Sequence, residues 1–273
     1  MSFTRIGANI TALQSMNELL RVNRLIGVGL LRLSSGKRIN SVGDDAAGFS
    51  LSRGLEARRR SLEQAVQNVG TAKNVLTIGE GGYLAIGSIL QIIKEKTVMG
   101  ADDSFNSDQR DAIQGQIDAL VSEIDDIVNE TSFQGQTLID GTFTSKQFQT
   151  GAAAGDVFGV SLNAADAATL GVTSLAVDNA ANASTAIAAV DAAINTLNTN
   201  AQIVGEYMIR LSSKEDFLAI AVTNTESARS RIEDADFAAE QMKLVRAQIV
   251  QQTAFSSFAQ ANSAPQLVLS LFR

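Results

Sequence analysis

Apolar residues recur at alternating intervals of three and four along two long stretches of the chain. This spacing keeps one side of a helix apolar for many turns and is typical of helices that pack lengthwise against each other. The first ladder, in residues 55–93, consists of Leu55, Leu62, Val69, Leu76, Tyr83 and Leu90, with Ala65, Ala72, Gly79, Ile86 and Ile93 as a second row. The second ladder, in residues 187–222, consists of Ile187, Val190, Ile194, Leu197, Ala201, Val204, Met208, Leu211, Leu218 and Val222. We expect these stretches to run antiparallel as a rod, which indicates construction rather than chemistry.

The first hundred residues predict two helices. The first covers residues 4–33, with Ile6, Ile10, Leu13 and Leu20 along one side, and ends at Ser34-Ser35-Gly36. Asp44 and Asp45 are placed to cap the second helix, because carboxylates accept hydrogen bonds from the free N–H groups of a helix start. That helix runs to about Val98 and would be about 80 Å long. Gly79, Gly81 and Gly82 predict a kink or a break within it.

The rest of the chain predicts three more helices and a short β region. Asn106-Ser107-Asp108 opens a helix that ends near residues 131–135. Short strands are expected over residues 142–144, 148–150 and 157–162, and residues 164–186, rich in Ala, Asn, Thr and Ser, give no clear element. A long helix follows over residues 184–229, with Glu215 in a seam position as a water-facing or interface point, and the last helix runs from Asp234 towards Phe258. The fold class is therefore mainly α, a long antiparallel helical bundle or coiled-coil rod with a small β-hairpin region.

Composition narrows the chemistry that the chain can perform. Its 273 residues include no Cys, His or Trp and a single Pro, and its net charge is −7. Without Cys or His, thiolate and imidazole nucleophiles, bases and metal ligands are missing. We therefore expect no enzyme, no catalytic or metal site and no cofactor, and the acidic charge argues against nucleic-acid binding. No run of about 18 apolar residues exists, so no membrane span is predicted.

Three segments in a fixed order carry a family resemblance. They are Leu33-Ser-Ser-Gly-Lys-Arg-Ile-Asn-Ser-Val-Gly-Asp-Asp-Ala-Ala-Gly48, Ser227-Ala-Arg-Ser-Arg-Ile-Glu-Asp-Ala-Asp-Phe-Ala-Ala-Glu240, and residues 259–273, which end in Leu-Ser-Leu-Phe-Arg. Together they closely resemble bacterial flagellin, and the likeness covers roughly residues 1–162 and 185–273. The resemblance implies a secreted structural protein of the bacterial flagellum, which self-assembles into the helical filament used for swimming motility.

The resemblance also implies a domain plan and a set of partners. Residues 1–43 and 235–273 would form an inner terminal coiled-coil domain, and residues 44–234 an outer helical rod domain with a β-hairpin near residues 142–162. The terminal segments would order on polymerisation through Ile6, Ile10, Leu13, Leu20, Leu33, Met242, Val245, Ile249, Phe258, Leu267, Leu269 and Leu271. Expected partners are further flagellin copies, an export chaperone at the C-terminal segment, and the filament cap and hook-junction proteins. No cleaved signal is predicted after residues 25–31, which fits type III export.

One departure from the family concerns recognition by an animal innate receptor. Flagellins that this receptor reads present Arg and Leu on the long helix and Glu on the next helix. The matching positions here are Ile92, Lys96 and Gln116, so we expect weak receptor activation.

Two alternatives stay open at the level of sequence. The hook–filament junction protein shares the terminal architecture, although the Ser-Arg-Ile-Glu-Asp-Ala-Asp segment from Ser230 and the Leu-Ser-Leu-Phe-Arg ending favour the filament subunit. A cytosolic coiled-coil binding or signalling module would instead have ends that are helical without a polymer.

Overall fold

The computed structural model describes the backbone of residues 9–270 and the side chains of residues 9–263. It divides into two compact units. Unit 1 combines residues 1–57 with residues 224–273, and unit 2 consists of residues 58–223. The boundaries expected at Gly43 and Asp234 stay a prediction, because they refer to the assembled filament and the units describe a single chain.

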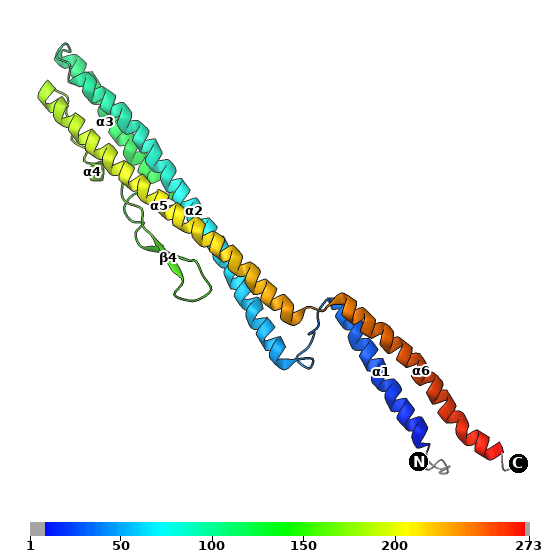
Figure 1. Cartoon of the computed structure of the whole chain (residues 1–273). Coiled ribbons are helices and arrows are strands. Elements are labelled where there is room, and N and C mark those ends of the chain that lie inside the picture. Colours follow the sequence, from blue (N-terminus) through cyan, green and yellow to red (C-terminus); the bar gives the residue numbers. More distant parts are fainter. Residues whose placement is uncertain (1–8, 271–273) are drawn as a thin grey trace. The chain divides into compact units, whose positions relative to one another are not determined.

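Unit 1 is built on two helices that pair antiparallel. Helix α1 (Ile10–Ser35) packs along α6 (Phe237–Ser270), as Figure 1 shows at the two ends of the colour scale. Asn9 donates to the carbonyl of Ala261 at 2.7 Å, Gln251 donates to the side-chain carbonyl of Asn23 at 2.6 Å, and Arg32 pairs with Glu240 at 3.7 Å. Along these three contacts the residue number rises on α1 and falls on α6. The two helices therefore keep one antiparallel register from Asn9 to Arg32.

The segment between α1 and α2 (Ala46–Gly100) is held by specific hydrogen bonds. Gly36 ends α1 at φ +71°, in the left-handed region that glycine tolerates best. Asp45 accepts from the amide of Gly48 at 2.9 Å and caps α2 as predicted. Asp44 does not share that role. Its carboxylate accepts from the amides of Ser41 and Asn40, and these bonds lower its pKa below the usual range.

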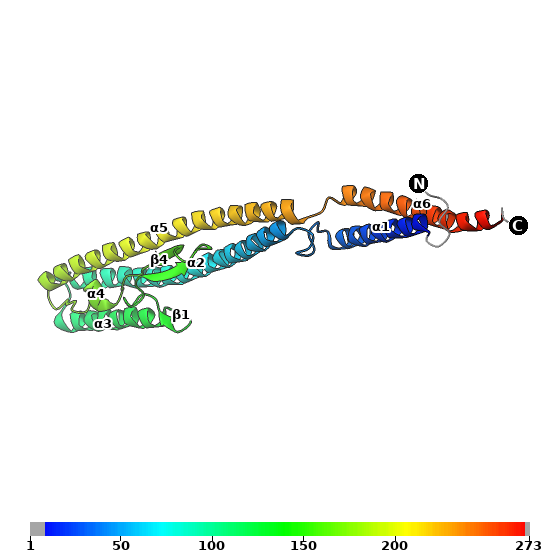
Figure 2. The ribbon, with the colours of Figure 1, turned by 90° about the horizontal axis from the view of Figure 1, so that it is seen from below.

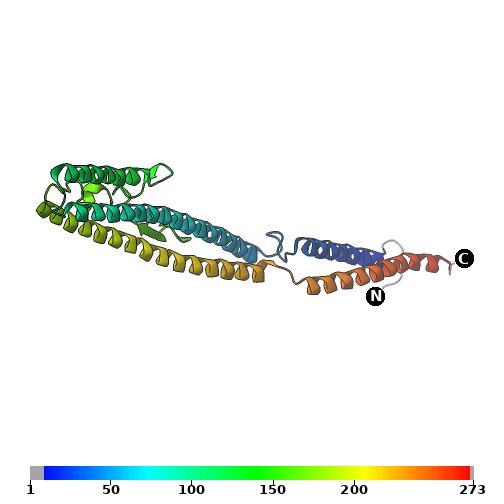
Figure 3. The same ribbon diagram turned by 90° about the horizontal axis from the view of Figure 1, so that it is seen from above.

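Unit 2 packs three helices around one apolar core. The parts of α2 and α5 (Ala180–Glu233) that belong to this unit are joined by α3 (Ser107–Glu130), and Figures 2 and 3 show α3 alongside the other two. Both predicted ladders contribute to the core, which includes Leu62, Val69, Leu76, Tyr83, Leu90, Val190, Leu197, Val204, Leu211 and Leu218. The alternating spacing of three and four residues therefore predicted the buried faces of α2 and α5 correctly. The carboxylate of Glu215, at its seam position on α5, forms an ion pair with the ammonium group of Lys73 on α2 at 2.8 Å.

The predicted break at the glycines of α2 was wrong. Helix α2 runs without interruption from Ala46 to Gly100. A Cβ at Gly82 would lie 2.7 Å from Thr131 Oγ1, and one at Gly79 would lie 3.0 Å from Leu162 Cδ1. These two glycines let other segments approach the helix, whereas Gly81 faces open space.

The β region consists of two separate hairpins. Strands β1 (Ser132–Phe133) and β2 (Gln136–Thr137) flank a turn in which Gln134 and Gly135 both have positive φ. The predicted hairpin is formed by β3 (Lys146–Gln149) and β4 (Val157–Val160), paired antiparallel. The strand expected over residues 142–144 is not formed, because Asp140 accepts from the amide and hydroxyl of Thr142 in a turn.

A segment without a predicted element proved to be part of the core. Residues 165–177 carry the short helix α4 (Ala167–Leu170) and bury Ala165, Ala167, Leu170, Val172, Leu175 and Val177. Side chains of α3 hold this segment. Gln114 donates to the carbonyl of Leu175 and accepts from the amide of Val177, and Asp125 accepts from the amide of Ala167. This segment is therefore fixed in part by two polar side chains of α3 that are distant from it in sequence.

The bounds of α5 and α6 differ from the predictions. Helix α5 begins at Ala180, capped by Asn179, and continues to Glu233. Helix α6 continues past Phe258 and includes Pro265.

One window of α2 is apolar enough to cross a membrane by length and composition alone. Its mean hydropathy is 1.4 over 18 residues, and 39 % of it is buried within the structure. The sequence criterion counted uninterrupted apolar runs and so did not register this window. It is weak support for a span, because the same helix carries the core ladder of unit 2.

Candidate self-assembly surface

The contact between α1 and α6 combines small and larger apolar residues. The buried positions of this contact are Ala12, Leu19, Val22 and Gly29 on α1 and Leu244 on α6. A Cβ added to Gly29 would lie 3.6 Å from Leu244 Cδ1, an ordinary van der Waals separation, so the contact would also accept alanine at this point. These residues form the seam within one chain. Sequence reasoning missed them because apolar residues lie on more than one side of α1, and the side that is buried depends on where α6 packs.

The predicted assembly residues lie elsewhere on the same helices. At about 100° per residue, Ile10, Leu13 and Leu20 fall on the side of α1 that faces away from the seam. Met242, Val245 and Ile249 occupy the corresponding outer side of α6. All six are exposed, from 44 % for Val245 to 68 % for Met242. Each helix therefore has an apolar stripe on its outer side in addition to the seam.

The remaining predicted assembly residues divide into two groups. Leu33 and Phe258 are half-buried. Ile6 and Leu271 lie outside the described residues, as do the side chains of Leu267 and Leu269. Their part in assembly stays a prediction.

Charged groups fix one end of the α1–α6 pair. Glu240 is only 5 % exposed, and its carboxylate forms ion pairs with Lys243 at 2.7 Å and with Arg32 at 3.7 Å. Arg21 donates to Glu18 on the same helix at 3.0 Å, and this hydrogen bond lowers the pKa of the Glu18 carboxyl. Arginine and lysine stems also cover apolar neighbours, so these pairs position the helices besides balancing charge.

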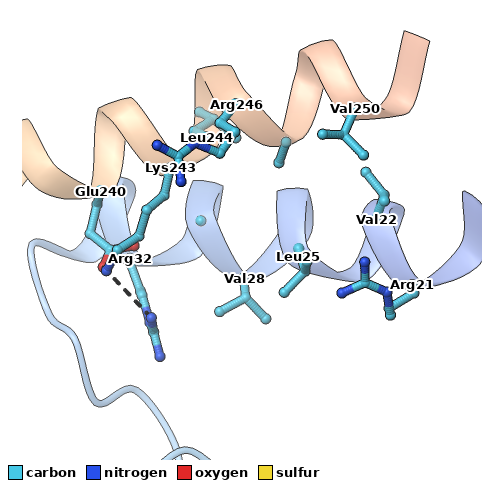
Figure 4. Close-up of a pocket in the computed structure, with 12 residues that line it drawn as sticks. Arg21, Val22, Leu25, Val28, Arg32, Glu240, Lys243, Leu244, Arg246 and Val250 are labelled. Atoms are coloured by element: carbon cyan, nitrogen blue, oxygen red, sulfur yellow. Dashed lines mark hydrogen bonds and ion pairs between the residues drawn. The ribbon is translucent and has the colours of Figure 1, made fainter. Parts of the chain in front are cut away.

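An open groove of about 290 Å³ lies between the two helices. Its apolar part includes Val22, Leu25, Val28, Leu244 and Val250, and its cations are Arg21, Arg32, Lys243 and Arg246. Figure 4 shows Arg21, Leu25 and Val28 following one another along α1, while Lys243 reaches from α6 towards Glu240 and Arg32. The groove thus combines an apolar wall with a positively charged border.

The three positions assigned to the innate receptor lie on unit 2. Ile92 and Lys96 stand one turn apart on α2, with Ile92 exposed and Lys96 half-buried. Gln116 is exposed on α3. All three are reachable from solvent to some degree, and their effect on recognition stays a prediction.

Among the described residues, no group of three or more His, Cys, Asp or Glu side chains is arranged to hold a metal ion. The features that distinguish the surface of unit 1 are apolar stripes, a groove and paired charges. Such features serve contact between protein chains rather than bond-making chemistry.

Comparison with known proteins identifies the family. A model of the bacterial flagellin N-terminal helical region matches residues 6–144, and a model of the bacterial flagellin C-terminal helical region matches residues 187–272. The chain belongs to the bacterial flagellin family. Flagellins are structural proteins, and the resemblance drawn from the terminal segments is confirmed.

Curated relatives match over nearly the whole chain. A flagellin of Bacillus subtilis is 33 % identical, with 98 % of this chain and 100 % of the relative covered. Flagellin FlaB1 of Treponema pallidum is 30 % identical over 98 % of this chain and 99 % of the relative. The flagellin of Halalkalibacterium halodurans is 34 % identical over 89 % of this chain and 90 % of the relative.

Two solved structures share the fold. The crystal structure of Bacillus cereus flagellin gives a TM-score of 0.50 at 24 % identity, over 55 % of this chain and 88 % of that one. A putative flagellar hook-associated protein from Vibrio parahaemolyticus gives 0.59 at 14 % identity, over 70 % of this chain and 100 % of that one. At such identities the likeness concerns the fold alone, so it does not favour a hook-associated role over the sequence match to flagellins.

Proposed function

We infer that this chain is a structural subunit of the bacterial flagellar filament. The observation that carries this inference is the flagellin match at both ends of the chain, over residues 6–144 and 187–272. The exposed stripes of unit 1 supply a physical basis for polymerisation. Fully burying one such leucine or isoleucine stabilises a protein by about 1.5–3 kcal/mol, and contact with neighbouring copies removes this surface from water.

We further propose that the terminal segments gain order when they join a filament. In one chain α1 and α6 bury a narrow apolar seam and leave the outer stripes in water. A helix pair with so little buried apolar surface gains stability when neighbouring copies cover its outer side. The domain boundaries near Gly43 and Asp234 belong to this proposal, since they separate the segments that order on assembly from the rest.

Location and other partners follow from the same proposal. A filament subunit acts outside the cell, so export of the chain and a place in the extracellular flagellum are expected. A chaperone at the C-terminal segment would cover its apolar residues before export, and cap and hook-junction proteins would border the filament. The exposed α6 stripe, with Met242 and Ile249, is the kind of surface that such partners cover.

Salt-induced polymerisation of the purified chain tests the function. The full chain should form long filaments visible by electron microscopy, and its helix content by circular dichroism should rise on assembly. Removing about forty residues from each end should abolish filaments while unit 2 keeps its cooperative thermal unfolding. A full chain that forms no long filaments alone would favour the hook-junction alternative, and ends that are already fully helical and stable in the monomer would favour a coiled-coil module.

A further inference from the structure

The groove between α1 and α6 has an excess of positive charge. Four cations line it, against the single carboxylate of Glu240. Glu240 is already shared by Arg32 and Lys243, and Glu18 is bound to Arg21. Arg246 has no ion pair within the described part of the chain, and Arg32 Nε is buried there without a hydrogen-bond acceptor. The groove therefore fits an occupant with an apolar body and negative charge.

The start of α6 presents a surface with those properties. Phe237 is 66 % exposed, which is unusual for a phenylalanine. Asp234 and Asp236 flank it, and both are exposed. The Asp236 carboxylate accepts from the amide of Ala239 at the helix start, while Asp234 lies just before it. We name Asp234, Asp236 and Phe237 the acidic knob.

We propose that the acidic knob of one copy docks into the α1–α6 groove of a second copy. In this arrangement Phe237 contacts the apolar wall at Leu25 and Val28, and the Asp234 carboxylate meets the guanidinium of Arg246. The proposal rests on the inferred function, because it names the contact through which copies join.

The knob cannot fill the groove of its own chain. Phe237 and Arg246 lie on the same helix, nine residues apart, which corresponds to about 13 Å along its axis. A rigid helix holds them at that separation, so the groove receives a knob only from another molecule. Knob and groove are different surfaces of one unit, so the contact is heterologous. Each added copy leaves one free knob and one free groove, which is the arrangement that an open helical polymer requires.

Cysteine cross-linking gives a direct test, because the chain contains no cysteine of its own. Phe237→Cys and Leu25→Cys are both made at exposed positions, so neither removes core packing. Filaments grown from an equal mixture should yield a disulfide-linked pair of subunits under mild oxidation. Each variant polymerised alone should yield far less of it. Filaments that form without this mixed product would overturn the proposal.

Substitutions in the acidic knob and in the groove give an independent test in polymerisation assays. Phe237→Ala and Arg246→Glu should each raise the critical concentration about tenfold, since truncating an interface anchor typically has an effect of this size. Phe237→Leu, which keeps an apolar knob, should assemble close to normally. Combining Arg246→Glu with Asp234→Arg should recover most of the loss, because the pair is restored with opposite signs.

The outcomes separate this proposal from the function on which it rests. If the unmodified chain forms filaments, and Phe237→Ala and Arg246→Glu assemble as well as it does, the docking contact is wrong and the filament function stands. A double reversal that assembles no better than Arg246→Glu alone would also overturn the pairing. If the unmodified chain forms no filaments, the proposed function itself fails.

Discussion

At the scale of single residues, neighbouring glycines on α2 have opposite effects on stability. Gly81 is exposed and has no atom near the place of a Cβ, whereas Gly82 is buried against Thr131 and Ile139. The Thr131 hydroxyl donates to the carbonyl of Ile127, so this side chain has little freedom to move aside. The same residue type therefore serves close packing at one position and only weakens the helix at the next.

Alanine substitution should show this difference. Gly82→Ala should lower the free energy of unfolding by about 1–3 kcal/mol, because the added methyl group overfills the contact with Thr131. Gly81→Ala is the matched control and should raise it by up to about 1 kcal/mol through helix propensity. Thermal unfolding followed by circular dichroism measures both, and equal shifts in the two variants would contradict the packing argument.

A partly buried hydrogen-bond chain joins the core residue Tyr83 to Asn200 through the exposed Asn163. Tyr83 donates from its hydroxyl to the carbonyl of Asn163 at 2.6 Å, and the Asn163 amide donates to Asn200 at 2.8 Å. Burial raises the pKa of Tyr83 well above its ordinary value, so the phenol stays protonated and keeps donating.

Removing the Tyr83 hydroxyl should therefore destabilise the core. Tyr83→Phe leaves the carbonyl of Asn163 without this donor and should lower the free energy of unfolding by about 1–3 kcal/mol. Tyr207→Phe, at a half-buried tyrosine on α5, should change it by less than about 0.5 kcal/mol. Urea unfolding of the two variants checks this, and a neutral Tyr83→Phe would show that the hydroxyl is dispensable.

At the scale of elements, the end of α5 and the segment after α1 are joined by one carboxylate. The Glu233 carboxylate forms ion pairs with Lys37 at 2.5 Å and with Arg229 at 2.7 Å. Its backbone carbonyl accepts a hydrogen bond from the amide of Arg38. Glu56 and Glu226 also face Arg229. Burial tends to raise the pKa of Glu233, but the hydrogen bonds from Lys37 and Arg229 outweigh it, and the net pKa is lowered.

This junction should loosen in acid. A carboxyl with a lowered folded-state pKa adds stability above its ordinary pKa, and that stability is lost as the pH falls through the folded value. Hydrogen exchange at the amides of Arg38 and Ala235, corrected for intrinsic rate, should therefore show less protection below about pH 4.

Glu233→Gln should reduce this protection already at neutral pH, by about 1–3 kcal/mol, and flatten its pH dependence. Glu123→Gln, at an exposed carboxylate of α3, serves as the control and should change neither. Unchanged pH dependence in Glu233→Gln would assign the effect to other groups.

The sequence predicted elements well where their order is local and less well where it is not. The ladders of α2 and α5 gave the core of unit 2, because leucine, isoleucine and valine at a helical period mark one face. The segment over residues 165–177 gave no period, since its order comes from Gln114 and Asp125, which are distant in sequence. On α1 the stripe with Leu13 and Leu20 was found, but the seam with Leu19 and Val22 was missed, because both sides of the helix carry apolar residues and only the position of α6 decides which side is buried.

At the scale of the whole molecule, charge is divided unevenly between the two units. Residues 1–57 and 224–273 hold 12 basic and 9 acidic residues, whereas residues 58–223 hold 10 basic and 20 acidic residues. The unit with the exposed apolar stripes is thus the positive one, and the other carries the negative charge that keeps copies apart in solution. Added salt screens this repulsion, so polymerisation should become easier as ionic strength rises.

Purified monomer should activate the animal flagellin receptor only weakly. Ile92, Lys96 and Gln116 replace an arginine fork, an apolar anchor and a carboxylate expected at those positions, and the loss of such anchors usually reduces binding strongly. A reporter-cell assay with a potent flagellin as reference checks this, and full potency would contradict it. Ile92→Arg should raise activity if the arginine position is aligned correctly, while Gln202→Arg on exposed α5 should not.

The antiparallel register of α1 and α6 makes the two chain termini depend on each other. Asn9 donates a hydrogen bond to Ala261, and Gln251 donates one to Asn23. Each described stretch of α1 is therefore matched by a stretch of α6. A cut within α1 or α6 would therefore also remove the support of the matching stretch on the other helix, more than 200 positions away along the chain. Damage to either helix would then have the same outcome, because each one loses the surface on which the other is folded.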